Sequence, residues 1–208
     1  MLAPALKPVF NFWYNPTIIG KENIPEDGAL VIACNHIHVF DQCLTIISTK
    51  RPINYMAKKE YFEGRLRGFF KFVGCIPVNR NGKDTDAVAS ALTVLRRDGA
   101  VGIFPEGTRN KTDAFLLPFK FGAVSMAKKT GATVLPVAVT GDYEFRSKNL
   151  TVRFGKPFDV ENLTVAQANE KLYNEIAALM NMNLDSARNC KKEKAEKRQN
   201  MSKHRSDF

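Results

Sequence analysis

A histidine and an aspartate five residues apart form the first combination in this chain that could do chemistry. His36 follows the apolar run Ala29–Cys34, and Asp41 closes the short segment after it. On one helix the two side chains would lie about 140° apart, whereas across a turn the carboxylate can fold back onto the imidazole. A carboxylate so placed fixes the imidazole tautomer and stabilises the imidazolium. The pattern therefore predicts that His36 is a general base near neutral pH and that Asp41 orients it.

Other interpretations of this segment stay open from the residues alone. Asp41 could instead be the N-cap of a following helix. His36 and His38 would face the same way on a strand, as metal ligands do, but the third histidine, His204, lies near the C-terminus. The sequence contains no G-x-S-x-G nucleophile elbow, which argues against a serine hydrolase.

A second group of reactive residues, Phe104–Arg109, follows the apolar run Val101–Phe104. Gly107 permits close backbone approach to a ligand, and the planar guanidinium of Arg109 suits a phosphate. A surface loop with a Glu106–Arg109 ion pair is the alternative. Arg80 adds another cation after the strand-like residues 75–77, although one arginine by itself is a weak signal.

Together these segments resemble the four sequence blocks of the glycerolipid acyltransferase family, in the order in which that family carries them. The likeness covers Thr17 to Leu163 and is closest to the 1-acylglycerol-3-phosphate acyltransferases. The blocks are Asn35-His36 with Asp41, Gly74–Arg80, Phe104–Arg109 and Val134–Ala138.

The resemblance implies a mechanism. His36 removes a proton from the free hydroxyl of a lysophospholipid, expected to be 1-acylglycerol-3-phosphate, and that hydroxyl attacks an acyl thioester of coenzyme A or of acyl carrier protein. Asp41 orients His36, and neither a metal nor an organic cofactor is expected. The resemblance assigns the acceptor's phosphate to Arg80, Lys58 and the loop residues Glu106, Gly107, Thr108 and Arg109.

Two rival functions stay open. The first is a same-family acyltransferase that acts on glycerol-3-phosphate or on another lysolipid. The second is a non-catalytic protein that binds anionic membranes through its basic residues. No nucleic acid partner is expected. The set His36, Asp41, Glu106 and Arg109 favours an enzyme, because a binding module has no evident need for it.

Along the chain around these motifs, apolar runs alternate with amphipathic stretches, which predicts an α/β fold. We expect a single domain with a mixed central sheet flanked by helices, as the family resemblance implies. The predicted strands are Ala29–Cys34, Ile53–Ala57, Val101–Phe104, Thr133–Val139 and Leu150–Phe154. The predicted helices are Asp84–Arg97, Gly122–Thr130 and Val165–Met180.

The 208 residues suffice for one well-buried domain, and the formal charge of +10 favours an anionic partner such as a membrane surface. We predict an apolar membrane-interface segment over residues 1–16, in which Pro4 and Pro8 argue against a long helix. The acyltransferase domain is expected over residues 17–183. Residues 184–208 are expected to form a basic, flexible tail, since few of them are apolar.

No apolar run approaches the roughly 20 residues that span a bilayer. The four cysteines, Cys34, Cys43, Cys75 and Cys190, form no Cys-x-x-Cys pair and are predicted to be reduced thiols. The phenylalanines interleaved with basic residues between Phe62 and Phe72 either contact a membrane or pack into the core. These features predict a peripheral or monotopic protein on the cytoplasmic face of the cell membrane.

Overall fold

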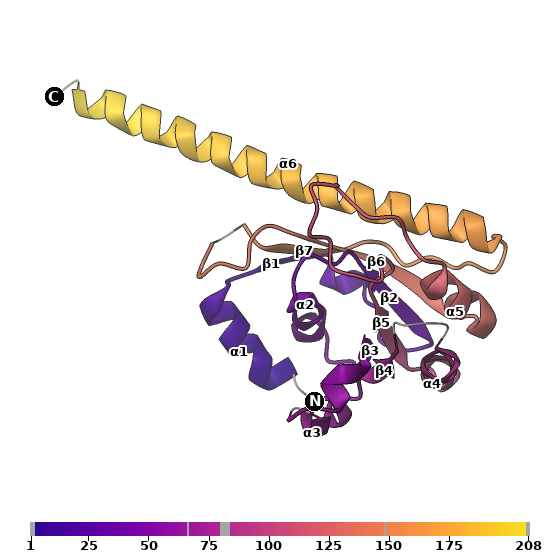
Figure 1. Ribbon diagram of the computed structural model, residues 1–208. Helices are drawn as coiled ribbons and strands as arrows, with labels where there is room; N and C mark the ends of the chain where they lie inside the picture. Colours follow the sequence, from indigo (N-terminus) through magenta and orange to yellow (C-terminus); the bar gives the residue numbers. More distant parts are fainter. Residues whose placement is uncertain (1–2, 66, 80–83, 148, 207–208) are drawn as a thin grey trace.

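The computed structural model describes residues 3–65, 67–79, 84–147 and 149–206 (Figure 1). Helices and strands alternate along most of the chain, as an α/β domain requires. In chain order the elements are α1 (Ala3–Trp13), β1 (Thr17–Ile19), the 3₁₀ turn η1 (Lys21–Asn23), β2 (Leu30–Cys34), α2 (Asp41–Ser48), β3 (Ile53–Lys58), the 3₁₀ turn η2 (Lys59–Phe62), α3 (Arg67–Phe72), β4 (Ile76–Val78), α4 (Thr85–Leu95), β5 (Ala100–Ile103), α5 (Gly122–Thr130), β6 (Thr133–Thr140), β7 (Thr151–Phe154) and α6 (Val165–Ser206).

Within the described residues, seven strands form one sheet in the order β1-β7-β6-β2-β5-β3-β4. Neighbouring strands run parallel, apart from the antiparallel pair β6 and β7. The sheet is therefore mixed, and the predicted single α/β domain is confirmed. The five strands from β6 to β4 all end at the same edge, which is the usual place for a ligand site in an open parallel sheet.

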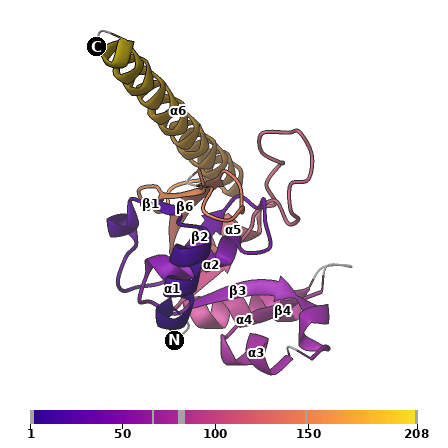
Figure 2. The ribbon, with the colours of Figure 1, turned by 90° about the vertical axis from the view of Figure 1, so that its left-hand side faces the viewer.

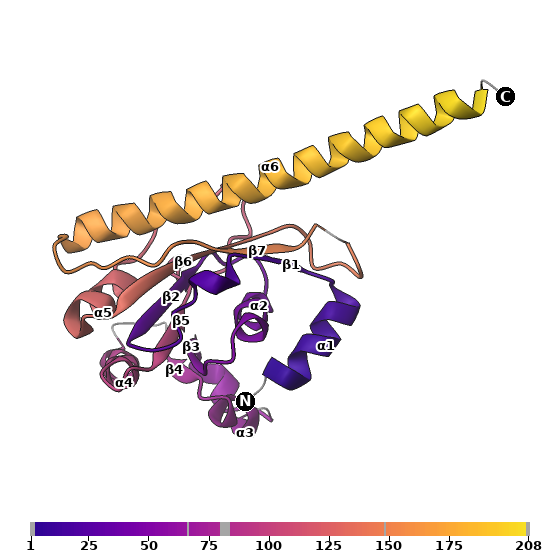
Figure 3. The ribbon, with the colours of Figure 1, turned by 180° about the vertical axis from the view of Figure 1, so that it is seen from behind.

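Helices cover both faces of the sheet (Figures 1 and 3). On one face α4, α5 and the first half of α6 pack over a core that includes Val31, Val101, Val124 and Leu172. On the other face α1 and α2 cover Leu30, Ile32 and Leu135. Strand β2 is buried along its whole length, because its successive side chains point alternately into these two cores. The segment after β2, which carries His36 and Asp41, thus starts from a rigid position.

Helix α1 corrects the expectation drawn from Pro4 and Pro8. The chain is helical from Ala3 to Trp13 with Pro8 inside the helix. Pro4 lies in the first turn, where backbone N–H groups have no intrahelical partner, whereas Pro8, the sixth residue, costs the helix one hydrogen bond to the residue four positions before it. Phe10 is buried against the domain and packs edge-on against Phe40. The N-terminal segment therefore docks onto the domain through one face.

Helix α6 is longer than the apolar pattern predicts, since it continues beyond Met180 to Ser206. Its buried side chains recur with helical spacing from Ala168 to Asn183. Beyond them the helix projects away from the sheet (Figure 2 shows it running obliquely up to the C-terminus). Helix α6 includes most of the segment predicted to be a basic, flexible tail (residues 184–208), where Lys, Glu, Ala and Arg have high helix propensity. The flexibility of that segment stays a prediction.

The Phe-rich stretch between Phe62 and Phe72 does not pack into the core, which was one of the two interpretations of its sequence. Helix α3 has no buried residue, and Phe72 is 79% exposed, so this stretch does not belong to the core. Leu66, within the same stretch, lies outside the described residues. Across residues 3–206, leaving out 66, 80–83 and 148, no helix is both long and apolar enough to cross a membrane.

Candidate active site

The sequence motifs come together at the carboxyl edge of the sheet. Strands β2 and β5 are parallel neighbours, with Ala33 paired to Ile103, so the segments that follow them emerge side by side. These segments carry His36 and Glu106. On the opposite side of β2, Cys34 pairs with Val137 of β6, which brings the turn after β6 to the same edge. The topology thus unites groups about 70 and 100 residues apart in sequence.

His36 and Asp41 form a buried pair. His36 Nδ1 lies 2.8 Å from Asp41 Oδ2, and the exposed fractions of the two side chains are 10% and 0%. Asp41 is the first residue of α2 but does not cap it, because Phe40 stands at the N-cap position. Its carboxylate folds back over the turn, as the spacing predicts. Since a carboxylate accepts, the proton of a neutral His36 sits on Nδ1, which leaves the lone pair on Nε2.

The Asp41 carboxylate accepts hydrogen bonds from four groups. Oδ2 accepts from His36 Nδ1 and from the backbone N–H groups of Ile37 and His38, each at 2.8 Å. Oδ1 accepts from the Tyr143 hydroxyl at 2.7 Å. A buried carboxylate stays tolerable only when it is satisfied in this way. The turn from His36 to Asp41 is therefore wrapped around one anionic side chain.

An aromatic ring also packs against the face of the His36 imidazole. It stacks on Phe104 with ring centroids 3.9 Å apart and planes inclined by 13°. Phe104 in turn lies against Tyr55 of β3. Between this stacking and the bond to Asp41, the ring has a fixed orientation, which a general base requires.

Glu106 connects the loop after β5 to the turn from His36 to Asp41. Its Oε1 accepts from the backbone N–H of His36 at 2.6 Å, and its Oε2 accepts from that of Leu117 at 3.1 Å. Asn110 completes the link, since its backbone N–H donates to the His36 carbonyl at 2.7 Å. Burial raises the pKa of Glu106, against the lowering effect of these two amide bonds. Both oxygens of Glu106 thus face backbone, and the alternative ion pair with Arg109 is not what this carboxylate forms.

Gly107 allows a lysine to lie against the same loop. Its φ of 72° falls in the left-handed region that favours glycine. A Cβ placed there would meet Lys120 Cε and Nζ at 2.8 Å, so the missing side chain makes room for the Lys120 ammonium. The Lys120 backbone N–H donates to the Pro105 carbonyl at 2.8 Å, which fixes this residue beside the loop.

Arg109 and Thr108 are exposed at the outer end of the loop. Arg109 is close enough to His38 to affect it electrostatically. Burial lowers the pKa of His38, and Arg109 and His36 lower it further, against the opposing effect of Asp41. The Arg109 guanidinium thus lies within electrostatic range of the turn from His36 to Asp41, and the Lys120 ammonium lies beside Gly107 of the neighbouring loop.

The remaining predicted residues have different outcomes. Lys58 ends β3 at the same edge of the sheet, where its ammonium pairs with Glu60 Oε1 at 2.8 Å. Arg80 lies outside the described residues, two positions after β4. Cys34, Cys43 and Cys75 are free thiols. In the part of the chain that the structure describes, no three His, Cys, Asp or Glu side chains gather closely enough to hold a metal ion.

Sequence reasoning missed Tyr143 and Lys120. Tyr143 follows β6 by three residues and contacts Asp41 from 102 positions away. Neither residue stands in a short pattern that spacing alone could connect with His36. The only available signal was their position in the fold, because Tyr143 follows strand β6 and Lys120 lies beside the loop after β5, both at the carboxyl edge of the sheet.

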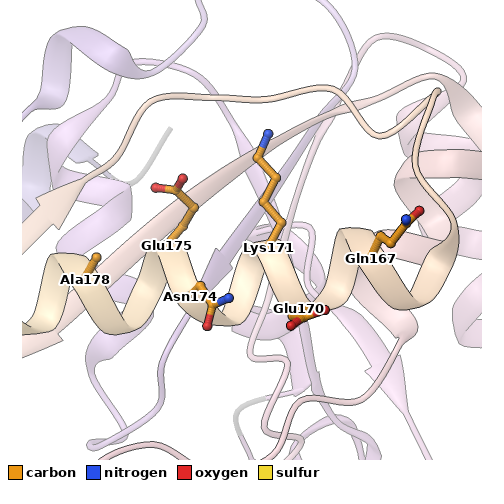
Figure 4. Close-up of a pocket in the computed structure, with 6 residues that line it drawn as sticks. All are labelled: Gln167, Glu170, Lys171, Asn174, Glu175 and Ala178. Atoms are coloured by element: carbon orange, nitrogen blue, oxygen red, sulfur yellow. The ribbon is translucent and has the colours of Figure 1, made fainter.

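A surface pocket lies elsewhere, along α6 (Figure 4). It is lined by Gln167, Glu170, Lys171, Asn174, Glu175 and Ala178. All of these side chains belong to one helix and lie on a different face from its buried residues Ala168, Leu172 and Ile176. The pocket shares no residue with the site around His36.

Comparison with known proteins identifies the class. Residues 15–140, more than half of the chain, match the Acyltransferase family, and the chain belongs to that family. The family predicted from the sequence blocks is confirmed.

Two relatives carry the comparison further. The chain is 31% identical over 176 residues to the 1-acyl-sn-glycerol-3-phosphate acyltransferase of Bacillus subtilis, covering 82% of this chain and 87% of that protein. It is 35% identical over 141 residues to the protein of the same name from Borreliella burgdorferi, covering 66% of this chain and 56% of that protein.

A solved structure supports the fold. The chain resembles the 1-acyl-sn-glycerophosphate acyltransferase PlsC from Thermotoga maritima with a TM-score of 0.71 and 22% identity. The likeness covers 85% of this chain and 78% of that one. The two proteins therefore share an architecture.

Proposed function

We propose that this protein transfers a fatty acyl group from a thioester to the free hydroxyl of 1-acylglycerol-3-phosphate, which gives phosphatidic acid. The observation that carries the proposal is the buried His36–Asp41 pair beside a cationic loop. The chain belongs to the acyltransferase family, and a relative named for this activity matches 82% of it.

In this mechanism His36 Nε2 takes the proton of the acceptor hydroxyl. The hydroxyl oxygen forms a bond to the thioester carbonyl carbon, and the carbon–sulfur bond then breaks. The departing thiolate takes the proton back from the imidazolium, so His36 ends the cycle neutral. Asp41 holds the Nδ1–H and stabilises the imidazolium during the reaction.

Glu106 is assigned to positioning and not to substrate binding. Both of its oxygens accept backbone N–H groups, and a carboxylate repels a phosphate. Its bonds to His36 and Leu117 instead set the distance between the catalytic turn and the loop that carries the cations.

The acceptor's phosphate is assigned to Arg109 and Lys120, together with Thr108, the backbone at Gly107 and Arg80. The Lys120 ammonium lies beside Gly107, and Arg109 follows Gly107 by two residues, on a loop that Asn110 bonds directly to His36. Charge-assisted hydrogen bonds from such groups favour a phosphate dianion. Lys58 is left out of this group because Glu60 already pairs with its ammonium.

Changing His36 to alanine should remove the base. The acyl-transfer rate should fall about 10²–10⁴-fold, since general base catalysis contributes that much. Transfer is measured with acyl-CoA and 1-acylglycerol-3-phosphate, and vesicle binding is measured in parallel and should be nearly unchanged. His204→Ala is the matched control and should keep full activity. A His36→Ala protein that stays folded and active would refute the assignment.

Changing Arg109 or Lys120 to glutamine should weaken binding of the phosphorylated acceptor. Each change should raise the acceptor KM about tenfold, because each removes one charge-assisted bond. The donor KM should move little. Lys129→Gln, an exposed lysine on α5, controls for net charge. A rise confined to the donor KM would contradict the assignment to the acceptor.

A membrane surface is proposed for the exposed aromatic cluster formed by Phe12, Trp13 and Phe145. Phe145 packs against Trp13 and Phe12 with ring centroids 5.1 and 6.2 Å apart. All three side chains are more than half exposed. Arg146, whose backbone N–H donates to the Trp13 carbonyl, adds a positive charge beside them. Exposed aromatics next to a cation suit the interface of an anionic bilayer.

This cluster is continuous with the catalytic turn. Tyr14 and Phe10 of the α1 region pack against Phe40, which lies between His38 and Asp41 in space and sequence. Phe40 and Val39 are themselves partly exposed. A lysolipid in the bilayer surface would therefore reach His36 along an apolar path. We place the protein peripherally on the cytoplasmic face, where the free thiols of Cys34, Cys43 and Cys75 fit a reducing compartment.

Replacing Trp13 and Phe145 together with serine should weaken binding to anionic vesicles by about tenfold or more, because burial of each large aromatic contributes roughly 1.5–3 kcal/mol. Sedimentation with phosphatidylglycerol–phosphatidylcholine vesicles measures the effect. Met182→Ser is the matched control, since Met182 is 52% exposed like Trp13 (51%) but lies on α6, across the sheet. Equal loss in both variants would contradict a specific membrane surface.

A further inference from the structure

Tyr143 contacts Asp41 of the proposed catalytic pair but takes no part in the proposed proton transfer. Its hydroxyl donates to Asp41 Oδ1 at 2.7 Å, while the imidazole and two backbone amides all use Oδ2. The two carboxylate oxygens therefore have separate tasks. Oδ2 faces the turn from His36 to Asp41, and Oδ1 faces Tyr143, from the segment after β6, which is the neighbour of β2 on the side away from β5.

The turn that carries Tyr143 is fixed at its base. Asn35, next to His36, bonds both the N–H and the carbonyl of Val139 on β6, at 2.7 and 2.9 Å. Gly141, with a φ of 92°, then lets the chain pass against the Asn149 carbonyl, where a Cβ would lie only 2.2 Å away. Asn149 also holds Asp142 through its side chain.

The Tyr143 ring is clamped as well. It stacks on His38 with centroids 4.1 Å apart and planes inclined by 22°, and Tyr14 packs edge-on against it at 5.5 Å. Burial, and then the negative charge of Asp41, raise the pKa of Tyr143 well above its ordinary value. The phenol therefore keeps its proton at any pH at which the protein works, and it can only donate to Oδ1.

We propose that Tyr143 is a positioning residue of the acyl-transfer site, which holds the Asp41 carboxylate by Oδ1 so that Oδ2 stays turned toward His36. The inference rests on the proposed catalytic role of the His36–Asp41 pair. Tyr143 does not touch the reacting atoms and acts through Asp41.

This role has an electrostatic consequence. The phenol shares the negative charge of the carboxylate, so without it more of that charge faces the imidazolium. His36 should then hold its proton more tightly, and the carboxylate should lose its fixed rotation. The other titratable or charged groups that interact with this pair or with the neighbouring His38 are His38 itself, Glu106, Tyr55, Cys34, Cys43 and Arg109. None of them changes when Tyr143 becomes phenylalanine.

Tyr143→Phe keeps the ring and removes only the donor. The variant should show a kcat about tenfold lower with an acceptor KM within about twofold of wild type, since a bond to a charged group is lost. Nitrogen NMR of protein with labelled histidine gives a readout that needs no substrate. With three histidines in the chain, His36 is assigned from the signal missing in His36→Ala. Its titration midpoint should move to higher pH, with a proton affinity about threefold greater.

Two controls separate positioning from packing. Tyr173→Phe removes a phenol on α6 whose hydroxyl lies 3.5 Å from the Leu116 carbonyl, and it should leave both readouts unchanged. In an Asp41→Asn background, Tyr143→Phe should no longer shift the His36 titration, because the charge through which it acts is gone. Should Tyr143→Phe fold poorly, 3,5-difluorotyrosine at position 143 keeps the shape and donates more strongly, and it should move the His36 midpoint to lower pH.

The outcomes divide cleanly. A Tyr143→Phe protein with wild-type kcat and an unmoved His36 titration would overturn the proposal. An equal shift with and without the Asp41 carboxylate would also overturn it. If the wild-type protein transfers no acyl group, the proposed function fails, while the NMR comparison still decides whether Tyr143 acts through Asp41.

Discussion

One buried carboxylate organises the site. Asp41 has no exposed surface, and a charge so placed must be met by hydrogen bonds from every side. The chain supplies them by wrapping the turn from His36 to His38 around Oδ2 and by bringing Tyr143 to Oδ1. The hydrogen bonds that satisfy the carboxylate thus include the one that orients the imidazole. The stability of the turn and the proposed proton transfer therefore depend on the same contacts.

The sheet makes that arrangement possible. Parallel neighbours β6, β2 and β5 end at one edge, and the segments after them meet there although they are far apart in sequence. Glu106 and Asn110 bond the loop after β5 to the backbone of His36 on both its N–H and its carbonyl. The backbone of the loop that carries Arg109 and Lys120 is therefore fixed relative to His36, the base in the proposed mechanism.

The chain's chemistry was easier to predict than its long-range contacts. His36 and Asp41 lie five residues apart, so one turn suffices to unite them, and the sequence blocks indicated both the family and the mixed α/β fold. The assignments of Tyr143 and Lys120 needed the sheet order, because no local pattern connects either residue with His36. Glu106 was expected among the phosphate ligands, but only the folded chain shows its oxygens on backbone amides. The helical course of the chain at Pro8 and beyond Met180 was not predicted for a related reason, since composition predicts burial better than it predicts helix formation.

The central claim is direct acyl transfer to an acylglycerol phosphate. Its most direct test offers the purified protein acyl-CoA or acyl carrier protein thioesters with 1-acylglycerol-3-phosphate, glycerol-3-phosphate and a lysophosphatidylcholine, with products and intact protein followed by mass spectrometry. We expect phosphatidic acid as the main product from at least one donor, with no acyl group left on the protein. Preferred acylation of another acceptor, or a protein-bound acyl group that passes on to the acceptor, would contradict it.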